Sequence, residues 1–106
     1  NDTILGWEKS TDKRTVEFCK KYLDISPKAN KSDFIWKFIK TAFASVGNTV
    51  IIQMQDYLEL GSEARMNTPS VLGGNWQWRM GKNDLTDKLA KKIADITCTY
   101  GRSERQ

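Results

Sequence analysis

Residues 49–55 of the chain have the sequence TVIIQMQ, in which three β-branched apolar residues follow one another directly. The turn-forming pair Gly47-Asn48 comes just before this run. A short continuous apolar run of this kind is typical of a strand that is buried on both faces, as the parallel strands of α/β proteins are. The sequence therefore predicts one buried strand over about residues 49–55.

Helices are predicted on both sides of this strand. Apolar side chains recur at helical spacing over about residues 12–24, 32–46 and 86–100. Ser32 and Thr86 are suitable N-cap residues for the second and third of these helices, because a hydroxyl can accept a backbone N–H at the start of a helix. The predicted order is therefore helix, helix, strand, long loop, helix.

One strand cannot form a sheet by itself. A strand buried on both faces needs a partner strand at each edge, and the rest of this sequence offers hardly one. The 106 residues are too few for two domains, and position 1 is Asn instead of an initiator Met. We therefore expect residues 1–106 to be a single fragment of a larger α/β fold, predominantly helical and with one clear buried strand.

The composition argues against membrane and nucleic-acid partners. Nowhere do about 18 apolar residues follow one another, so no membrane-spanning helix is expected. The chain carries 17 Lys and Arg against 13 Asp and Glu, which gives a net charge of +4. These cations are dispersed along the sequence, whereas a nucleic-acid groove gathers them on one face.

The chain contains no histidine and two cysteines. The lack of histidine excludes Ser-His-Asp and Cys-His nucleophile systems, histidine general bases and zinc sites with histidine ligands. Cys19 and Cys98 fall on predicted helices and cannot complete a zinc site alone. Reduced core thiols are expected, with a disulfide between them as the alternative, and no metal site is predicted. Acid–base chemistry would have to depend on carboxylates.

The long irregular stretch after the predicted strand is the first candidate for a functional site. Active sites of parallel α/β folds lie at the carboxyl ends of the strands, so Gln55, Asp56 and the loop that follows would line a site. Aromatic rings can bind the C–H face of a sugar, and amide and guanidinium groups can bind its hydroxyls. The loop combines these residue types in Arg65, Asn67, Asn75, Trp76, Trp78 and Arg79. The alternative is that the tryptophans pack in the core and the arginines form structural ion pairs.

Carboxylates that could take part in glycosidic chemistry are few. Such a reaction needs acidic residues at fixed separations. Four acidic residues lie near apolar or loop segments, namely Asp2, Asp56, Glu59 and Glu63. None of them stands out as a catalytic pair, and surface salt bridges are the alternative for each.

Four stretches of this sequence resemble one enzyme family. Residues 55–69 (QDYLELGSEARMNTP), 74–79 (GNWQWR), 1–7 (NDTILGW) and 100–102 (YGR) occur here in the order and spacing of a family pattern. The pattern resembles the C-terminal region of the 4-alpha-glucanotransferases, which are also called amylomaltases or disproportionating enzymes and belong to the alpha-amylase-like clan. The resemblance covers essentially the whole chain.

The resemblance implies a (β/α)8 barrel with inserted subdomains. It further implies cleavage of an α-1,4 bond in a glucan, a covalent glucosyl-Asp intermediate and transfer of the glucan to the 4-hydroxyl of another chain, without a metal or an organic cofactor. A barrel takes about 250 residues, so this chain would supply its last βα units. By resemblance, residues 49–55 correspond to the eighth strand and residues 86–100 to the closing helix.

The resemblance assigns no catalytic residue to this chain. The family motif Thr-His-Asp-Asn-Asp-Thr carries the transition-state stabiliser at its first Asp, and Asn1 and Asp2 match the two positions after it. The nucleophilic Asp and the acid/base Glu also lie upstream in the family. Asp2 is therefore not expected to be catalytic.

One binding residue follows from the resemblance. The Asn of the family's Ala-Arg-Met-Asn motif lies beside the donor sugar, and here it is Asn67. Arg65 would fix this loop, and Trp76 and Trp78 would pack beneath it. Trp7 could either pack or contact glucan.

We therefore expect a fragment of a cytoplasmic 4-alpha-glucanotransferase. Its partners would be α-1,4-glucans, that is, maltooligosaccharides, starch or glycogen, and it would require the N-terminal part of the barrel for activity. The alternative is a stand-alone polysaccharide-binding module that uses Trp76 and Trp78. A basic nucleic-acid binder with aromatic stacking is a third possibility, which the dispersed cations disfavour.

Overall fold

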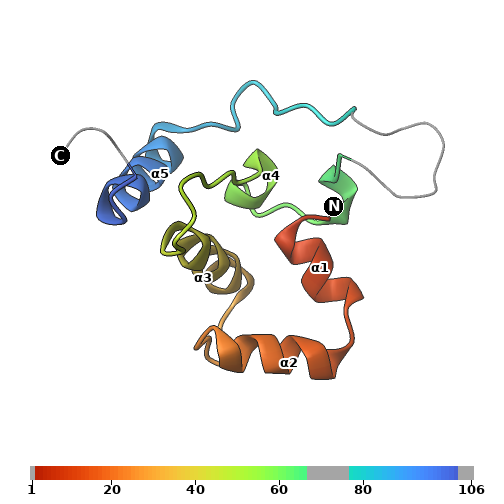
Figure 1. The fold of residues 1–106 in the computed structure, drawn as a ribbon. Helices are drawn as coiled ribbons and strands as arrows, with labels where there is room; N and C mark the ends of the chain where they lie inside the picture. Colours follow the sequence, from red (N-terminus) through yellow and green to blue (C-terminus); the bar gives the residue numbers. More distant parts are fainter. Residues whose placement is uncertain (1, 67–76, 103–106) are drawn as a thin grey trace.

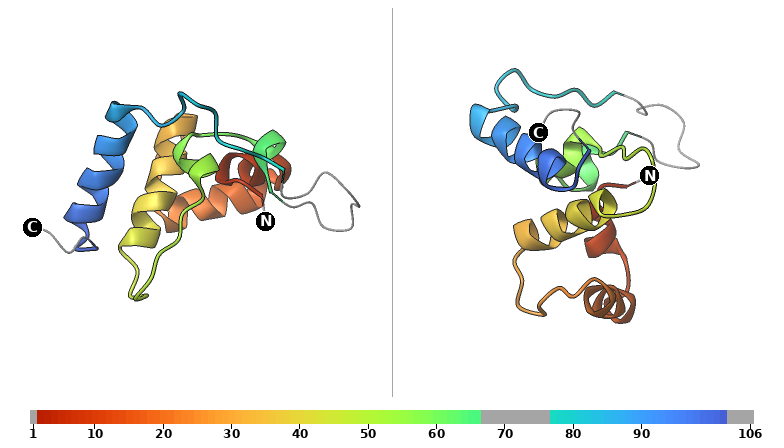
Figure 2. Two further views of the ribbon diagram at one scale, coloured as in Figure 1. Left: turned by 90° about the horizontal axis from the view of Figure 1, so that it is seen from above. Right: turned by 60° about the vertical axis from the view of Figure 1, so that its left-hand side comes forward.

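The computed structural model describes residues 2–66 and 77–102, and within them the chain is helical (Figure 1). In chain order the elements are α1 (Ile4–Ser10), α2 (Lys13–Tyr22), α3 (Lys31–Phe43), α4 (Met54–Tyr57), the 3₁₀ turn η1 (Ser62–Ala64) and α5 (Asp87–Thr99). Helix α3 lies at the centre and contacts α1, α4 and α5. Helix α2 lies on the opposite side of α3 from α4 (Figure 1 and Figure 2).

Four helices begin at a side chain that caps them. Thr3, Asp12, Asn30 and Thr86 each accept the backbone N–H of the residue three positions further on, at 2.8–3.1 Å. Each bond satisfies one of the N–H groups that a helix leaves free at its start. Thr86 is the N-cap that the sequence predicts for the last helix.

The start of α3 differs from the prediction. Its N-cap is Asn30, whose Oδ1 accepts the Asp33 N–H at 2.8 Å, so the helix begins before Ser32. Ser32 lies in the first turn and donates its hydroxyl to Glu59 at 2.9 Å. The predicted cap was therefore wrong, because an equally good capping side chain stands two residues earlier and the hydroxyl has a tertiary partner.

The core is built around one face of α3. Ile35 and Ile39 are fully buried, α1 and α5 each contribute one buried apolar side chain to the cluster around them, and Tyr57 of α4 packs against it. The cluster consists of Leu5, Ile35, Trp36, Ile39, Phe43 and Ile96. Because α1 and α5 both pack on α3, the position of each depends on α3.

The predicted strand over residues 49–55 is wrong for this chain. Residues 49–53 form no ladder, Met54 begins α4, and no strand occurs within residues 2–66 and 77–102. A ladder needs the N–H and C=O groups of a second strand, and the described residues present none to this segment. Val50 and Ile52 pack against the core, whereas Ile51 is 89% exposed.

Helix α1 was not predicted from the sequence. It is seven residues long and contains Gly6, so its apolar residues are too few to show helical periodicity. Its position depends on contacts with α3 and η1. The predominantly helical character of the chain is confirmed, but the described residues contain two α-helices (α1 and α4) and the 3₁₀ turn η1 that the predicted order lacks, and they contain no strand.

Two further expectations concern the state of the cysteine thiols and the presence of a membrane-spanning helix. Cys19 and Cys98 form no disulfide; Cys19 is half-buried, and burial raises its pKa, but Cys98 is exposed. The expectation of reduced thiols is confirmed, and that of two core cysteines is wrong for Cys98. None of the helices in the described residues is long and apolar enough to cross a membrane.

Candidate functional site

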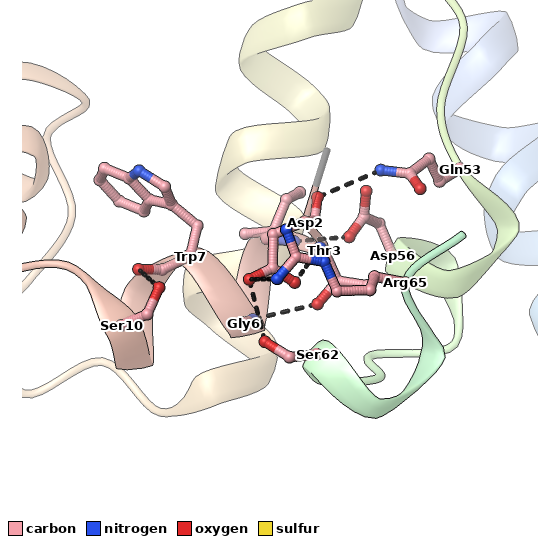
Figure 3. A network of polar contacts seen from close by, with 10 residues as sticks. Asp2, Thr3, Gly6, Trp7, Ser10, Gln53, Asp56, Ser62 and Arg65 are labelled. Carbon is pink, nitrogen blue, oxygen red and sulfur yellow. Dashed lines mark hydrogen bonds and ion pairs between the residues drawn. The ribbon is translucent and has the colours of Figure 1, made fainter. Parts of the chain in front are cut away.

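Polar side chains gather where the start of the chain meets the segment around α4 and η1 (Figure 3). We call this group the polar junction; it consists of Asp2, Thr3, Gly6, Gln53, Asp56, Ser62 and Arg65. The contacts between its two segments join residues that lie 51 to 63 positions apart in the sequence. The two segments are therefore held together mainly by directional polar contacts.

Asp56 is the most deeply buried acidic residue of the junction, with 6% of its surface exposed. Its Oδ1 accepts the backbone N–H of Ile4 at 2.7 Å. Burial raises the pKa of Asp56, and the neighbouring carboxylate of Asp2 raises it further, while the bond from Ile4 acts in the opposite direction. Asp56 thus supplies an acceptor for the first turn of α1, in a place where a full negative charge is disfavoured.

Asp2 connects the chain start to η1. Its Oδ2 accepts the hydroxyl of Ser62 at 2.9 Å and lies 3.6 Å from the guanidinium of Arg65. Its Oδ1 accepts the N–H of Thr3 at 2.7 Å, and its carbonyl oxygen accepts the Gln53 side-chain amide at 3.4 Å. Because these bonds use both its side chain and its backbone, Asp2 is fixed from two directions.

The junction requires a glycine at position 6. A Cβ at Gly6 would collide with Asp2 Oδ1 and Ser62 Oγ. Its backbone N–H is used as well, because it donates to Thr3 Oγ1 at 3.0 Å. The close approach of α1 to η1 therefore depends on the missing side chain.

A pocket of about 460 Å³ opens beside the junction. Its walls combine carboxylates and an amide with two aromatic rings, those of Trp7 and Phe38, which meet edge to face at 6.0 Å. The lining residues are Asp2, Thr3, Ile4, Trp7, Phe38, Gln53 and Asp56. Trp7 is half-buried, so it packs on α3 and also faces the pocket.

The turn that follows α4 is held by α3. Glu59 has a φ of 60°, a left-handed conformation that is unfavourable for a residue with a side chain. Its carboxylate accepts the hydroxyl of Ser32 at 2.9 Å and the indole N–H of Trp36 at 3.0 Å. The ring of Trp36 also lies under the Lys92 ammonium and against Tyr57. Glu59 is therefore a structural residue, and Trp36 contacts residues of neighbouring elements.

The predicted loop residues divide into two groups. Asn67, the predicted glucan-binding residue, lies outside the described residues, as do Asn75 and Trp76. Trp78 is half-buried, and Arg79 is exposed and donates to the Trp78 carbonyl at 3.0 Å. Arg65 belongs to the polar junction, where its ion pair with Asp2 agrees with the structural role predicted for it.

The other acidic candidates are used locally. Glu63 accepts the N–H of Gly61 at 3.1 Å, within its own turn. Within the described parts of the chain, no group of three or more Cys, Asp or Glu side chains is arranged to hold a metal ion. The carboxylates of the site bind backbone N–H, hydroxyl and guanidinium groups. This arrangement can hold the chain start and the α4–η1 segment in fixed positions relative to each other.

Three junction residues were not singled out from the sequence. Thr3, Gln53 and Ser62 are common polar types, and their partners lie far away along the chain. A turn signal at Gly61-Ser62 is the one local clue, and it does not indicate a contact with Asp2.

Comparison with known proteins identifies the family. The sequence profile of the 4-alpha-glucanotransferases matches residues 1–85, which includes both segments of the polar junction. The chain belongs to the 4-alpha-glucanotransferase family. The recognition made from residues 55–69 is thereby confirmed.

Individual relatives match almost the whole chain. The chloroplastic 4-alpha-glucanotransferase DPE1 of Arabidopsis thaliana is 43% identical over 96% of this chain and 18% of its own length. The 4-alpha-glucanotransferase of Clostridium butyricum is 42% identical over 98% of this chain and 21% of its own length. The chain thus spans about a fifth of the length of the curated relatives it matches.

A solved structure shares the fold. The amylomaltase of Streptococcus agalactiae, solved in complex with acarbose, superposes with a TM-score of 0.84 at 33% identity. The match covers 98% of this chain and 20% of the amylomaltase chain. The helical arrangement described here is therefore similar to a segment of an amylomaltase.

Proposed function

We propose that this chain is a segment of a longer 4-alpha-glucanotransferase that transfers α-1,4-glucan segments between maltooligosaccharides or starch-derived glucans. The observation that carries the proposal is the match over 96–98% of the chain to relatives that bear this name. The acarbose complex of the related amylomaltase supports a glucan-like substrate class. The partners would be maltooligosaccharides, starch or glycogen.

Within the longer enzyme, residues 1–106 would form the last βα units of a (β/α)8 barrel. The exposed Ile51 supports this part of the proposal, because this apolar side chain would be covered if the remaining sequence packed against it. The chain would then require the N-terminal part of the barrel. We further propose a cytoplasmic location.

The proposed role of the segment is to supply one wall of the glucan cleft and none of the reacting carboxylates. The aromatic and polar lining of the pocket beside the junction is of the kind that binds sugars. Asn67 would add a side-chain amide beside the donor sugar, two positions after Arg65. The nucleophile that forms the covalent glucosyl-Asp intermediate would come from the rest of the enzyme.

The experiment is a disproportionation assay with maltotriose on the full-length protein and on the isolated 106-residue chain. We expect the full-length protein to produce glucose and longer maltooligosaccharides and the isolated chain to produce neither. Transfer by pure isolated chain would contradict the assignment of roles. Saturable binding of maltoheptaose by the isolated chain, followed by tryptophan fluorescence, would instead favour a stand-alone polysaccharide-binding module.

Asn67 can be tested in the same assay. Asn67→Ala in the full-length protein should reduce turnover far more than Thr68→Ala, because the amide both donates to and accepts from sugar hydroxyls. Equal effects of the two substitutions would indicate that Asn67 has a structural role.

A further inference from the structure

Asp56 is a buried carboxylate in the lining of the pocket beside the polar junction. It is 6% exposed, it lies in α4, and its Oδ1 holds the Ile4 N–H at 2.7 Å across 52 positions of sequence. Helix α4 has four residues, so its own hydrogen bonds cannot fix it firmly. The bond to Ile4 therefore connects two short helices that would otherwise be weakly held.

Resting on the proposed function, we propose that Asp56 is a positioning residue of the glucan-transfer reaction, which holds the chain start and η1 together as one rigid wall of the glucan cleft. Its bond to Ile4 places Asp2, and Asp2 in turn holds Ser62 and Arg65. Arg65 stands at the end of η1, directly before the stretch that contains Asn67. Loss of the bond would let the two sides of the wall move apart.

The hydrogen-bond acceptor is the part of Asp56 that matters for this role. Asp2 is the negative neighbour of Asp56, and burial together with that charge makes the ionised form unfavourable. Arg65 is the nearby cation, and it forms its ion pair with Asp2. The uncharged amide oxygen of an asparagine at position 56 can also accept the Ile4 N–H, so Asp56→Asn should retain this bond.

The test measures kcat and KM for maltotriose in the full-length protein. Asp56→Ala removes the acceptor, and we expect KM to rise about tenfold while kcat stays within about twofold, because lost ground-state binding acts on KM. Asp56→Asn keeps a carbonyl oxygen, and its KM should stay within about twofold of the wild-type value. Asp12→Ala is the matched control: Asp12 also accepts an N–H at a helix start, at 2.9 Å, but far from the junction, and its KM should not change.

Two results would overturn the proposal. One is a lower kcat with an unchanged KM in Asp56→Ala, as expected when a substitution merely reduces the folded fraction. The other is an Asp56→Asn enzyme as impaired as Asp56→Ala, which would mean that the charge is required. A wild-type protein that transfers no glucan would refute the proposed function instead, so the two failures can be distinguished.

A second variant keeps the test decisive if Asp56→Ala does not fold. Ser62→Ala removes an exposed hydroxyl that donates to Asp2, and it should raise KM about threefold. Ser10→Ala, which removes an exposed hydroxyl that donates to the Trp7 carbonyl, is its control and should leave KM unchanged. An unchanged KM in Ser62→Ala would overturn the proposal.

Discussion

The chain start packs Leu5 and Trp7 on α3 and adds hydrogen bonds to α4 and η1, whereas α5 contacts the rest of the molecule through a few apolar side chains and two cations. At the start, Asp56 holds Ile4 and Ser62 holds Asp2. At the other end, Ile96 is buried in the core, and the Lys92 ammonium lies 3.8 Å from the centre of the Trp36 ring. Both ends rest on α3, but by different kinds of interaction.

The guanidinium of Arg102 makes the second cation contact of α5. It donates to the carbonyl oxygens of Phe43 at 2.9 Å and Ser45 at 3.0 Å, and to that of Asn48 at 3.4 Å. These carbonyls lie at the end of α3 and just after it, where the C=O groups have no N–H donor within the helix. A long flexible side chain thereby joins the ends of α3 and α5.

This difference between the chain start and α5 indicates which of the two is better suited to form a binding site. Hydrogen bonds between short, buried side chains fix positions closely, because their energy falls steeply with distance and angle. Apolar packing and cation contacts tolerate small shifts. The chain start is therefore suited to form a cleft wall, and α5 is suited to cover the core.

A substitution in the buried face of α3, on which both ends of the chain pack, should produce the largest loss of stability. Ile39→Ala empties a fully buried position of α3, and we expect a loss of about 2–5 kcal/mol of local stability. Native-state hydrogen exchange of the full-length protein should show faster opening of α3, α1 and α5 together. Val46→Ala, at a fully exposed position, is the control and should change stability by less than about 0.5 kcal/mol. Opening of α5 alone would contradict the central place given to α3.

Substitution of Gly6 should weaken only the contacts that the chain start makes with the rest of the molecule. Gly6→Ala forces a Cβ against Asp2 and Ser62, and we expect a cost of about 1–3 kcal/mol. The amides of α1 should exchange faster while those of α5 are unchanged. Gly47→Ala is the matched control, because a Cβ there meets its nearest neighbours at an ordinary 3.7 Å. Equal effects of the two substitutions would show that the approach of α1 to η1 is not close.

Substitution of Arg102 should weaken only the contacts between α5 and the end of α3. Arg102→Ala deletes three bonds to carbonyl oxygens, and we expect a loss of about 1–2 kcal/mol, since the contacts are partly exposed. Faster exchange should be confined to α5 and the end of α3. Arg102→Lys keeps the charge but not the forked donors, so it should recover part of the loss. A change in the α1 amides would mean that the two ends are coupled.

The smallest expected effect is a change of stability with pH, which should have opposite signs for Asp12 and Asp56. The N–H and hydroxyl of Thr15 lower the pKa of Asp12, so Asp12 adds stability above its unfolded pKa, which is lost as the pH falls through its folded pKa. Burial raises the pKa of Asp56, so its contribution is complete below its unfolded pKa and is lost as the pH rises through its folded pKa. On acidification, thermal unfolding should therefore show Asp56→Asn losing stability relative to the wild type and Asp12→Asn gaining. The same sign for both would contradict the burial of Asp56.

The elements that local sequence determines were predictable. Thr86 marks the start of α5 because capping depends on neighbours three positions away. Helix α2 follows Asp12 for the same reason. The segment 49–55 was misjudged because a strand depends on partner strands, which sequence periodicity cannot supply.

The polar junction could not be predicted in the same way. Asp2 and Ser62 are 60 positions apart, and neither residue carries a local signal of the other. The sequence did single out Asp56 and Arg65, because they follow an apolar run and stand in a family motif. Which groups they bind depends on the packing of α1 and η1 against each other.

The central claim is that the polar junction forms a wall of the glucan cleft. The most direct measurement is hydrogen exchange of the full-length protein with and without maltoheptaose. We predict slower exchange of the amides of residues 3–6 and 53–66 when the glucan is bound, and unchanged exchange in α2 (Lys13–Tyr22). Unchanged exchange at the junction, or protection in α2 alone, would contradict the claim.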